Sequence, residues 1–406
     1  MSVRWSRVGL AGYAGGTGLG FLAAALSAGP LAARSDFMSF YSAASLLLQG
    51  RGDRIYDLNV LGAQQAILLT AANVRLTENA VALPYPLPPF ATLWFLPFAL
   101  LPLNLAYLLW DGLSAVAVLF AIWRTLRTLG WAPDAAGLGA LLGLTYIPSL
   151  ASLLLGQTSL FLVLVLALAA LSLLAGRSRG AGLYLALALF KPQYVVLPLL
   201  GLLARRQWRP IAWFAGLALV LAAVGIALAG VTGLIDYISL LRSISAPGGI
   251  PTIRPFAMTN WRGMASRLFL EHDPGLAMAM TLAGNALTLL LVVLVWRRGW
   301  PDERSTWLAR LSALLVAALV VSPHAYPHDA AILILPACWM ATLARSGHLH
   351  LPAVIALLAL GHGLGFISGL FGLRGFADLN VLLALGALAI LLWSLRRRVE
   401  VAPLLG

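Results

Sequence analysis

The chain has 406 residues, of which 61% are hydrophobic and only 10% are charged, and its mean hydropathy is +0.91. A water-soluble domain carries about a quarter charged residues, so this composition excludes a chain that is mainly soluble. The formal charge of +13 does not indicate nucleic acid as a partner, because the basic residues stand mainly in short clusters at the ends of apolar runs. The positive-inside rule and contacts with anionic membrane lipids explain such clusters.

The apolar runs are long, rich in Leu and Ala, and lack the ten-residue alternation of a membrane β-barrel. They predict an all-α polytopic membrane protein of one domain (1–406), with about twelve transmembrane helices and a range of 11–13. The expected segments are 8–30, 88–103, 104–123, 137–155, 157–175, 181–203, 210–230, 275–296, 305–322, 329–344, 351–371 and 376–395. Arg4 and Arg7 precede the first run, which favours a retained helix over a cleaved signal peptide.

Charge clusters orient the second half of the chain. We expect ARRQWR (204–209), WRRGW (296–300), Arg345 and LRRRVE (395–400) to be cytoplasmic. The long connections 31–87 and 231–264 and the turn 323–328 then fall on the extracytoplasmic side.

Two basic clusters, RTLR (124–127) and GRSRG (176–180), do not fit twelve simple crossings. Two repairs are possible: segment 88–103, which is rich in proline, does not fully cross, or segment 181–203 breaks at Lys191-Pro192-Gln193. The sequence leaves the choice open.

Asp36 stands where the first helix leaves the membrane, next to Phe37, Phe40 and Tyr41. Residues 37–48 predict an amphipathic interfacial helix, because their apolar side chains recur at helical spacing. A carboxylate at the water boundary suits a general base, and Tyr41 is an expected substrate contact. The alternative for Asp36 is an N-cap of that helix.

The rest of the first outer connection is polar and rich in proline. Asp57 is expected to cap a helix over 58–70. Tyr85, within ALPYPLPPF (82–90), is a candidate substrate contact, with packing as the alternative.

Lys191 lies in the middle of an apolar run, where an unpaired ammonium group costs several kcal/mol. If the helix breaks at Pro192, Lys191 and Gln193 point from its tip into a polar cavity, and Lys191 could bind a phosphate there. The alternative is a structural ion pair with an acid such as Asp111.

The stretch PTIRPFAMTNWRGM (251–264) places Arg254 and Arg262 beside Asn260 and Trp261. Guanidinium groups are well suited to phosphate, and Trp suits a sugar ring. These residues therefore predict substrate contacts, with anchoring to lipid headgroups as the alternative.

In SPHAYPHDA (322–330), Pro327 separates His324 from His328, so the two do not share a helix face and zinc is not expected. Pro327 fits the first turn of the next helix, and Asp329 in that turn favours the helix dipole. His324 then lies in the outer turn, free to donate to a phosphate or hydroxyl group, and His328 is a further candidate for substrate binding.

Together these pieces resemble glycosyltransferase family 87, the membrane mannosyltransferases that use polyprenyl-phosphate-mannose. The matching elements, in chain order over about 290 residues, are DF-x-x-FY-x-A at 36–43, the G-x-x-x-YD turn at 52–57, PYPLPP, the GQ of LLLGQTSLF (153–161), FKPQ at 190–193, the NWRG loop and SPHAYPHD.

The resemblance implies a C-type glycosyltransferase fold and an inverting transfer that needs neither metal nor cofactor, at the extracytoplasmic face of the membrane, which we expect to be a bacterial inner membrane. It implies Asp36 as general base, with Lys191, Arg262, His324 and Arg254 around the donor phosphate. The expected partners are a polyprenyl-phosphate-linked sugar, a glycolipid or glycan acceptor and membrane lipids.

A transporter or flippase is the main alternative, because broken helices and an intramembrane lysine also occur in that class. The acceptor, the linkage formed and the oligomeric state cannot be read from the sequence.

Overall fold

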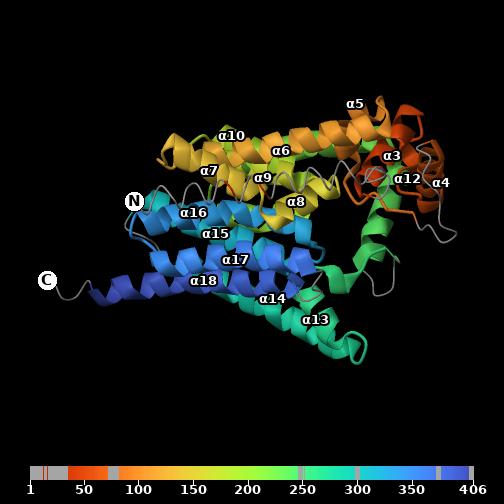
Figure 1. The fold of residues 1–406 in the computed structure, drawn as a ribbon. Helices are drawn as coiled ribbons and strands as arrows, with labels where there is room; N and C mark the ends of the chain where they lie inside the picture. Colours follow the sequence, from red (N-terminus) through yellow and green to blue (C-terminus); the bar gives the residue numbers. More distant parts are fainter. Residues whose placement is uncertain are drawn as a thin grey trace.

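The computed structural model describes residues 35–71, 82–245, 250, 252–297, 302–371 and 376–401, together with the single residues 12 and 16, and excludes the side chains at 364–371, 376–379 and 395–401. All regular structure in these ranges is helical, and the long helices run side by side (Figure 1). In the first half these are α3 (Phe37–Leu48), η1 (Gly52–Arg54), α4 (Leu58–Ala71), η2 (Pro89–Phe95), α5 (Leu96–Ala99), α6 (Leu103–Thr128), α7 (Pro133–Leu144), α8 (Ile147–Leu154), α9 (Ser159–Leu174), α10 (Ser178–Leu187), η3 (Ala188–Phe190), η4 (Pro192–Tyr194) and α11 (Val196–Ala204). They are followed by α12 (Trp208–Ser245), η5 (Pro255–Ala257), α13 (Trp261–Phe269), α14 (Pro274–Arg297), α15 (Glu303–Val321), η6 (Pro327–Leu333), α16 (Ile334–Arg345), α17 (Leu351–Phe371) and α18 (Phe376–Val401).

Among the described residues, five helices are long and apolar enough to cross a membrane, or six if the bent pair α7–α8 is one span. Further apolar helices of 10–17 residues accompany them, among them α9 and both halves of segment 181–203. The chain is therefore an all-helical integral membrane protein. Every expected segment from 88 onwards coincides with helix, whereas the first, 8–30, lies outside the described residues. The count of twelve crossings stays a prediction.

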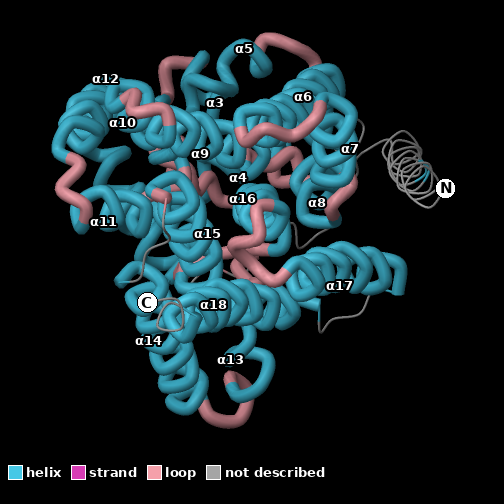
Figure 2. The backbone as a smooth tube through the Cα atoms, turned by 90° about the vertical axis from the view of Figure 1, so that its left-hand side faces the viewer, coloured by secondary structure: helices cyan, strands magenta, loops and turns pink. Residues whose placement is uncertain are grey.

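The bundle has a buried centre. Seen end-on in Figure 2, α9, α15 and α16 lie in the middle, with α6, α7 and α8 on one side and α10 to α12 on the other. In the apolar stretch of α15, 89% of the residues are buried. In that of α12 only 11% are buried, so its apolar side chains face outward. Because lipid surrounds such a bundle, an apolar exterior is the expected outcome.

Segment 181–203 is broken at Lys191, as one of the two explanations for the misplaced basic clusters predicts. α10 and η3 run up to Lys191, whose φ of −129° and ψ of 74° are not helical, and Pro192 opens η4 before α11 returns. The two ends of this hairpin therefore lie at the same end of the bundle. Arg179, at the start of α10, stacks over the Trp213 ring of α12 at 5.2 Å.

The other repair is also present, because 88–103 forms only η2 and the four-residue α5, too short together to span about 30 Å of hydrocarbon. The end of α6 then lies beside the end of α16. Arg345 donates to Leu129 O at 3.3 Å, and Arg304 donates to Thr128 O at 2.7 Å. RTLR (124–127) thus joins the other basic clusters at one end.

The helix expected over 37–48 is present as α3, but protein covers most of its surface, so it is not the one-sided amphipathic helix that was expected. Its position at the membrane interface stays a prediction. Ten of its twelve residues are buried. Ser39 donates to Pro84 O and Tyr41 to Leu101 O, both at 2.7 Å, so the proline-rich stretch and α5 cover it. The small residues at 42–45 allow this close packing.

The second long connection is also more helical than expected. α12 does not end at 230 but continues to Ser245 after a kink at Gly230, where φ is 66° and ψ is −179°. The outer part of α12 packs on η1, because Gly52 has no side chain and a Cβ there would lie 2.1 Å from Leu228 O.

Candidate active site

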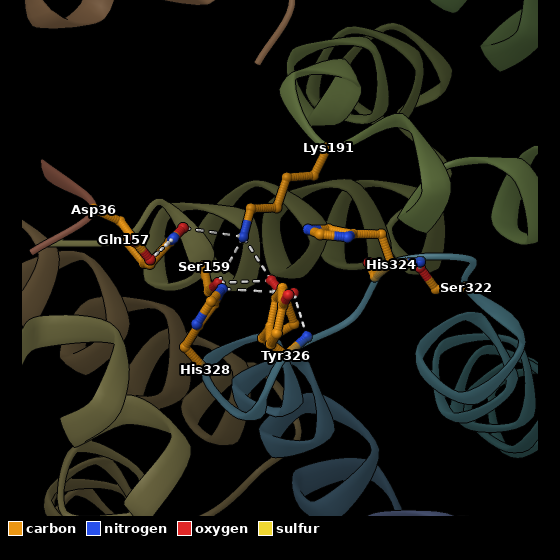
Figure 3. Close-up of polar contacts among 9 residues, drawn as sticks. Asp36, Gln157, Ser159, Lys191, Ser322, His324, Tyr326 and His328 are labelled. Atoms are coloured by element: carbon orange, nitrogen blue, oxygen red, sulfur yellow. Dashed lines mark hydrogen bonds and ion pairs between the residues drawn. The ribbon is translucent and has the colours of Figure 1, made fainter. Parts of the chain in front are cut away.

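A polar cluster lies where four segments meet inside the apolar bundle. Figure 3 shows Asp36 before α3, Gln157 and Ser159 at the start of α9, Lys191 at the break after η3, and the turn from Ser322 to His328. These segments are far apart in the sequence, so the fold alone brings them together.

Lys191 is enclosed and paired. Its Nζ lies 2.5 Å from Asp329 Oδ1 and 2.9 Å from Ser159 Oγ, and a longer contact of 3.5 Å reaches Gln157 Oε1. The Lys191 and Asp329 side chains are only 7% and 3% exposed. These contacts engage the three N–H donors of the ammonium group. The structural alternative is therefore present, but its acid is Asp329 and not Asp111, the partner suggested from the sequence.

Asp36 does not cap α3 with its side chain. Its Oδ2 instead accepts a hydrogen bond from Gln157 Nε2 at 2.7 Å, and the residue remains partly exposed. The carboxylate is thus held in place and still accessible, as a general base requires. Its alternative role as an N-cap is not seen, whereas Asp57 does cap α4 by accepting from Asn59 N at 3.0 Å.

The turn that carries the histidines begins η6 as expected, with Pro327 in the first turn. Asp329 Oδ2 accepts from Tyr326 N at 3.0 Å, so one carboxylate fixes the turn and also pairs with Lys191. His328 is buried, stacks on Tyr326 and lies 3.6 Å from Asp329 Oδ2. In the described part of the chain, no three His, Cys, Asp or Glu side chains form a group that could hold a metal ion.

His324 stands on the same turn, beside this cluster. Its ring meets the Tyr326 ring edge-on at 4.9 Å, and its Nδ1 is buried without a hydrogen bond among the described residues. Burial lowers the pKa of His324 to about 4; the negative charge of Asp329 opposes this shift, while His328 and the positive charges of Lys191 and Arg262 add to it. His324 is therefore neutral at pH 7, and can donate or accept a hydrogen bond but not act as a cation.

The second long connection (231–264) is attached to this turn. Thr259 N donates to Ala325 O at 2.8 Å, and Arg254 N donates to Tyr326 OH at 3.0 Å. Arg262 Nη1 donates to Pro323 O at 3.2 Å, and burial lowers the pKa of Arg262. Arg262 thus stands next to the histidine turn, whereas only the backbone of Arg254 does, because its side chain is exposed.

Other expected substrate contacts have structural roles. Asn260 caps α13 by accepting from Gly263 N at 2.8 Å and donates to Ser322 O at 2.8 Å. Trp261 is buried against Gly284 of α14 and donates to Thr288 Oγ1 at 2.9 Å. Tyr41 and Tyr85 are buried in the first outer connection, where Thr92 donates to Tyr85 OH at 3.0 Å.

Gln193 lies on η4 and is partly exposed, two residues beyond Lys191. Sequence reasoning missed the roles of four residues that complete the cluster: Gln157, Ser159, Tyr326 and Asp329. One signal was available, because a lysine inside an apolar run needs an acid, and Asp329 also stands at the start of an apolar segment.

Residues 85–323 match the sequence model of glycosyltransferase family 87, which is more than half of the chain. The chain belongs to glycosyltransferase family 87. The family match includes Gln157, Lys191 and Arg262, while Asp36 precedes it and His324 follows directly after it.

Two relatives bear the name polyprenol-phosphate-mannose-dependent alpha-(1-2)-phosphatidylinositol pentamannoside mannosyltransferase. The protein from Mycobacterium tuberculosis is 27% identical over 257 residues, which cover 61% of this chain and 56% of the relative. The one from Mycolicibacterium smegmatis is 29% identical over 262 residues, which cover 64% of this chain and 61% of the relative. The matched part of the chain thus spans about three fifths of these curated relatives.

Proposed function

We propose that this protein transfers a sugar from a polyprenyl-phosphate donor to a hydroxyl group of a glycolipid or glycan. The sugar we propose is mannose, as in the names of its two relatives. The observation that carries the proposal is the accessible Asp36 carboxylate, held by Gln157 beside a buried ion pair in a membrane bundle. The family and the names of the two relatives support the same donor.

In the proposed reaction, Asp36 takes the proton from the acceptor hydroxyl as its oxygen attacks the anomeric carbon. A new C–O bond forms on one face of the sugar while the bond to the phosphate oxygen breaks on the other. The electron pair leaves with the polyprenyl phosphate, and the configuration at the anomeric carbon is inverted. This direct displacement is consistent with a single accessible carboxylate.

The charge on the leaving phosphate needs fixed donors. Arg262 and a neutral His324 suit this role, because His324 stands on the turn beside the cluster and Arg262 contacts that turn. The exposed Arg254 side chain is a further candidate. Lys191 was expected to bind the phosphate directly, but its N–H groups are engaged by Asp329, Ser159 and Gln157. We therefore assign Lys191 to organising the site, with its positive charge balanced by Asp329.

The depth of the site fits a lipid donor. The 16 residues of α9 extend roughly 24 Å from the basic end of the bundle to Ser159, within about 30 Å of hydrocarbon. If α9 runs along the membrane normal with its basic end at one boundary, Ser159 comes close to the opposite boundary, within reach of the phosphate of a polyprenyl lipid. The positive-inside rule makes the basic end cytoplasmic and the site extracytoplasmic, in a bacterial inner membrane. A C-type glycosyltransferase fold of about twelve spans is part of the same proposal.

The test uses the full chain, purified in detergent, with a short-chain polyprenyl-phosphate-mannose labelled in the sugar and phosphatidylinositol mannosides as acceptors. We expect sugar transfer with inversion, seen by NMR of the product, and a loss of at least about 1,000-fold in D36N, because the base is removed. D53N is the matched control, since Asp53 is an exposed acid of the same connection.

Undiminished transfer in D36N would refute the base assignment. If the wild-type protein transfers no sugar from any lipid donor but moves lipid or sugar across liposomes, the transporter alternative replaces the enzyme.

A further inference from the structure

We propose that Gln157 is a positioning residue for the reaction, which holds one oxygen of the Asp36 carboxylate so that the other faces the acceptor hydroxyl. This inference rests on the proposed function. Gln157 is 9% exposed and bridges two groups of opposite charge, with Nε2 at 2.7 Å from Asp36 Oδ2 and Oε1 at 3.5 Å from Lys191 Nζ.

The neighbouring charges determine which way the amide of Gln157 points. An ammonium group has only donors and an ionised carboxylate only acceptors, so the amide oxygen must face Lys191 and the amide nitrogen must face Asp36. Lys191 is itself immobilised by Asp329 and Ser159. The orientation that allows Gln157 to donate to Asp36 is therefore fixed from the other side of the cluster.

The backbones that carry the two residues are also joined. Phe37 N donates to Leu155 O at 3.0 Å, and Trp110 Nε1 donates to Gly156 O at 2.9 Å. Gly156 has a φ of +60°, and a Cβ there would lie 2.6 Å from Phe37 Cβ. Asp36 and Gln157 thus flank one rigid joint between α3 and the α8–α9 turn.

This arrangement gives the two carboxylate oxygens of Asp36 different roles: Oδ2 accepts from Gln157, and Oδ1 is left for the acceptor proton. Among the described residues Gln157 is the hydrogen-bond donor to this carboxylate, at Oδ2. The pair of electrons on Oδ1 is then directed to the acceptor proton, and Gln157 itself neither gains nor loses a proton. Because a hydrogen bond donated to a carboxylate favours its charged form, the acid limb of the activity should respond to the loss of this donor.

The other titratable and charged groups that face Asp36 come from two further segments. Lys191 follows η3, while Tyr326, His328 and Asp329 belong to the turn and start of η6. Removal of the Gln157 amide takes away its 3.5 Å contact with Lys191, but Ser159 and Asp329 still hold that ammonium group, so a shift of the acid limb can be assigned to the lost donor to Asp36.

The experiment compares the pH dependence of kcat for sugar transfer in the wild-type protein, Q157M and Q157E. In Q157M we expect kcat at pH 7 to fall about tenfold or more, with an unchanged KM for the donor. The acid limb of the pH dependence of kcat should move up by about one pH unit, because one hydrogen bond to a charged group is lost. In Q157E the acid limb should move further, because a second carboxylate would face Asp36.

Q65M is the matched control, because Gln65 is also buried and bonded, to Leu83 O and Leu83 N at 2.8 and 3.0 Å, but lies outside the cluster. Its acid limb should match that of the wild type. If Q157M does not accumulate, Q157E, which has the same length, carries the test.

An acid limb that stays at the wild-type pH in the Gln157 variants would overturn the inference, whether or not kcat falls. A wild-type protein without transferase activity would instead overturn the proposed function, so the two failures are distinguishable.

Discussion

At the site end of the bundle Lys191 is enclosed with a carboxylate, whereas at the opposite end Arg345 and Arg304 are exposed and donate to backbone carbonyls. Arg345 also lies over the Trp131 ring at 4.6 Å. Both ends are cationic, but Lys191 needs a specific acid, whereas water and lipid headgroups solvate the exposed Arg345 and Arg304. The comparison indicates that single substitutions should be costly at the site and mild at the arginine end.

The largest effect is expected from K191M. It leaves Asp329 as a buried carboxylate without its cation, which costs about 3–5 kcal/mol of folding free energy. Thermal unfolding in detergent should show a large fall in Tm, and the double variant K191M/D329N should recover part of it because neither charge is then buried. A double variant as unstable as K191M would show that the pairing is not the cause.

Next in size is G156A, which should cost about 2–3 kcal/mol, because alanine is strained at a φ of +60° and its Cβ would press on Phe37. The same substitution at Gly176 is a matched control, since its φ is +68° but nothing lies within 4 Å of the added Cβ. Unfolding measurements should give a clearly smaller loss for G176A. Equal losses would contradict the rigid joint between α3 and the α8–α9 turn.

A smaller effect concerns His324, whose folded pKa of about 4 lies below the unfolded value near 6.5. Between these values the unfolded chain binds a proton that the folded chain does not, so folding stability should fall as the pH drops from about 6.5 to 4. H324Q cannot titrate, and its Tm should depend less steeply on pH over this window. Identical pH dependence in both proteins would mean that His324 is not held neutral.

The smallest effect is expected from R345Q, at about 1 kcal/mol or less, because exposed cationic contacts contribute little. Its Tm should lie close to that of the wild type, and sugar transfer should be unchanged. A loss as large as that of K191M would remove the distinction between the two ends.

The sequence predicted the fold correctly where a long apolar run or a single proline was enough to mark a helix or its end. Long apolar runs marked the helices, Pro192 marked the break beside Lys191, and Pro327 marked the start of η6. It failed where a pattern had two physical meanings. The spacing of 37–48 suits an amphipathic helix and a buried one equally. The apolar run 210–230 covers only part of α12, because helical residues continue beyond the kink at Gly230 to Ser245.

For the site, the sequence identified the charged residues that lie together but not the contacts between them. Asp36, Lys191 and His324 do gather, yet Lys191 pairs with an acid 138 residues away, which no local pattern shows. Asn260 and Trp261 were chosen for what their side chains can bind. Their amide and indole groups instead meet the backbone and α14, because caps and close helix contacts use the same chemistry as ligands.

The separation between Lys191 and Asp329 has a consequence for how the protein is made. At a synthesis rate of about 5–20 residues per second, the ribosome needs roughly 7–28 s to reach Asp329 after Lys191 has been added. During that interval α10 and α11 must be accommodated at the membrane with a lysine that has no acid. Insertion of this hairpin is therefore expected to be completed only when α16 arrives, which makes the last third of the chain necessary for the stable placement of the middle.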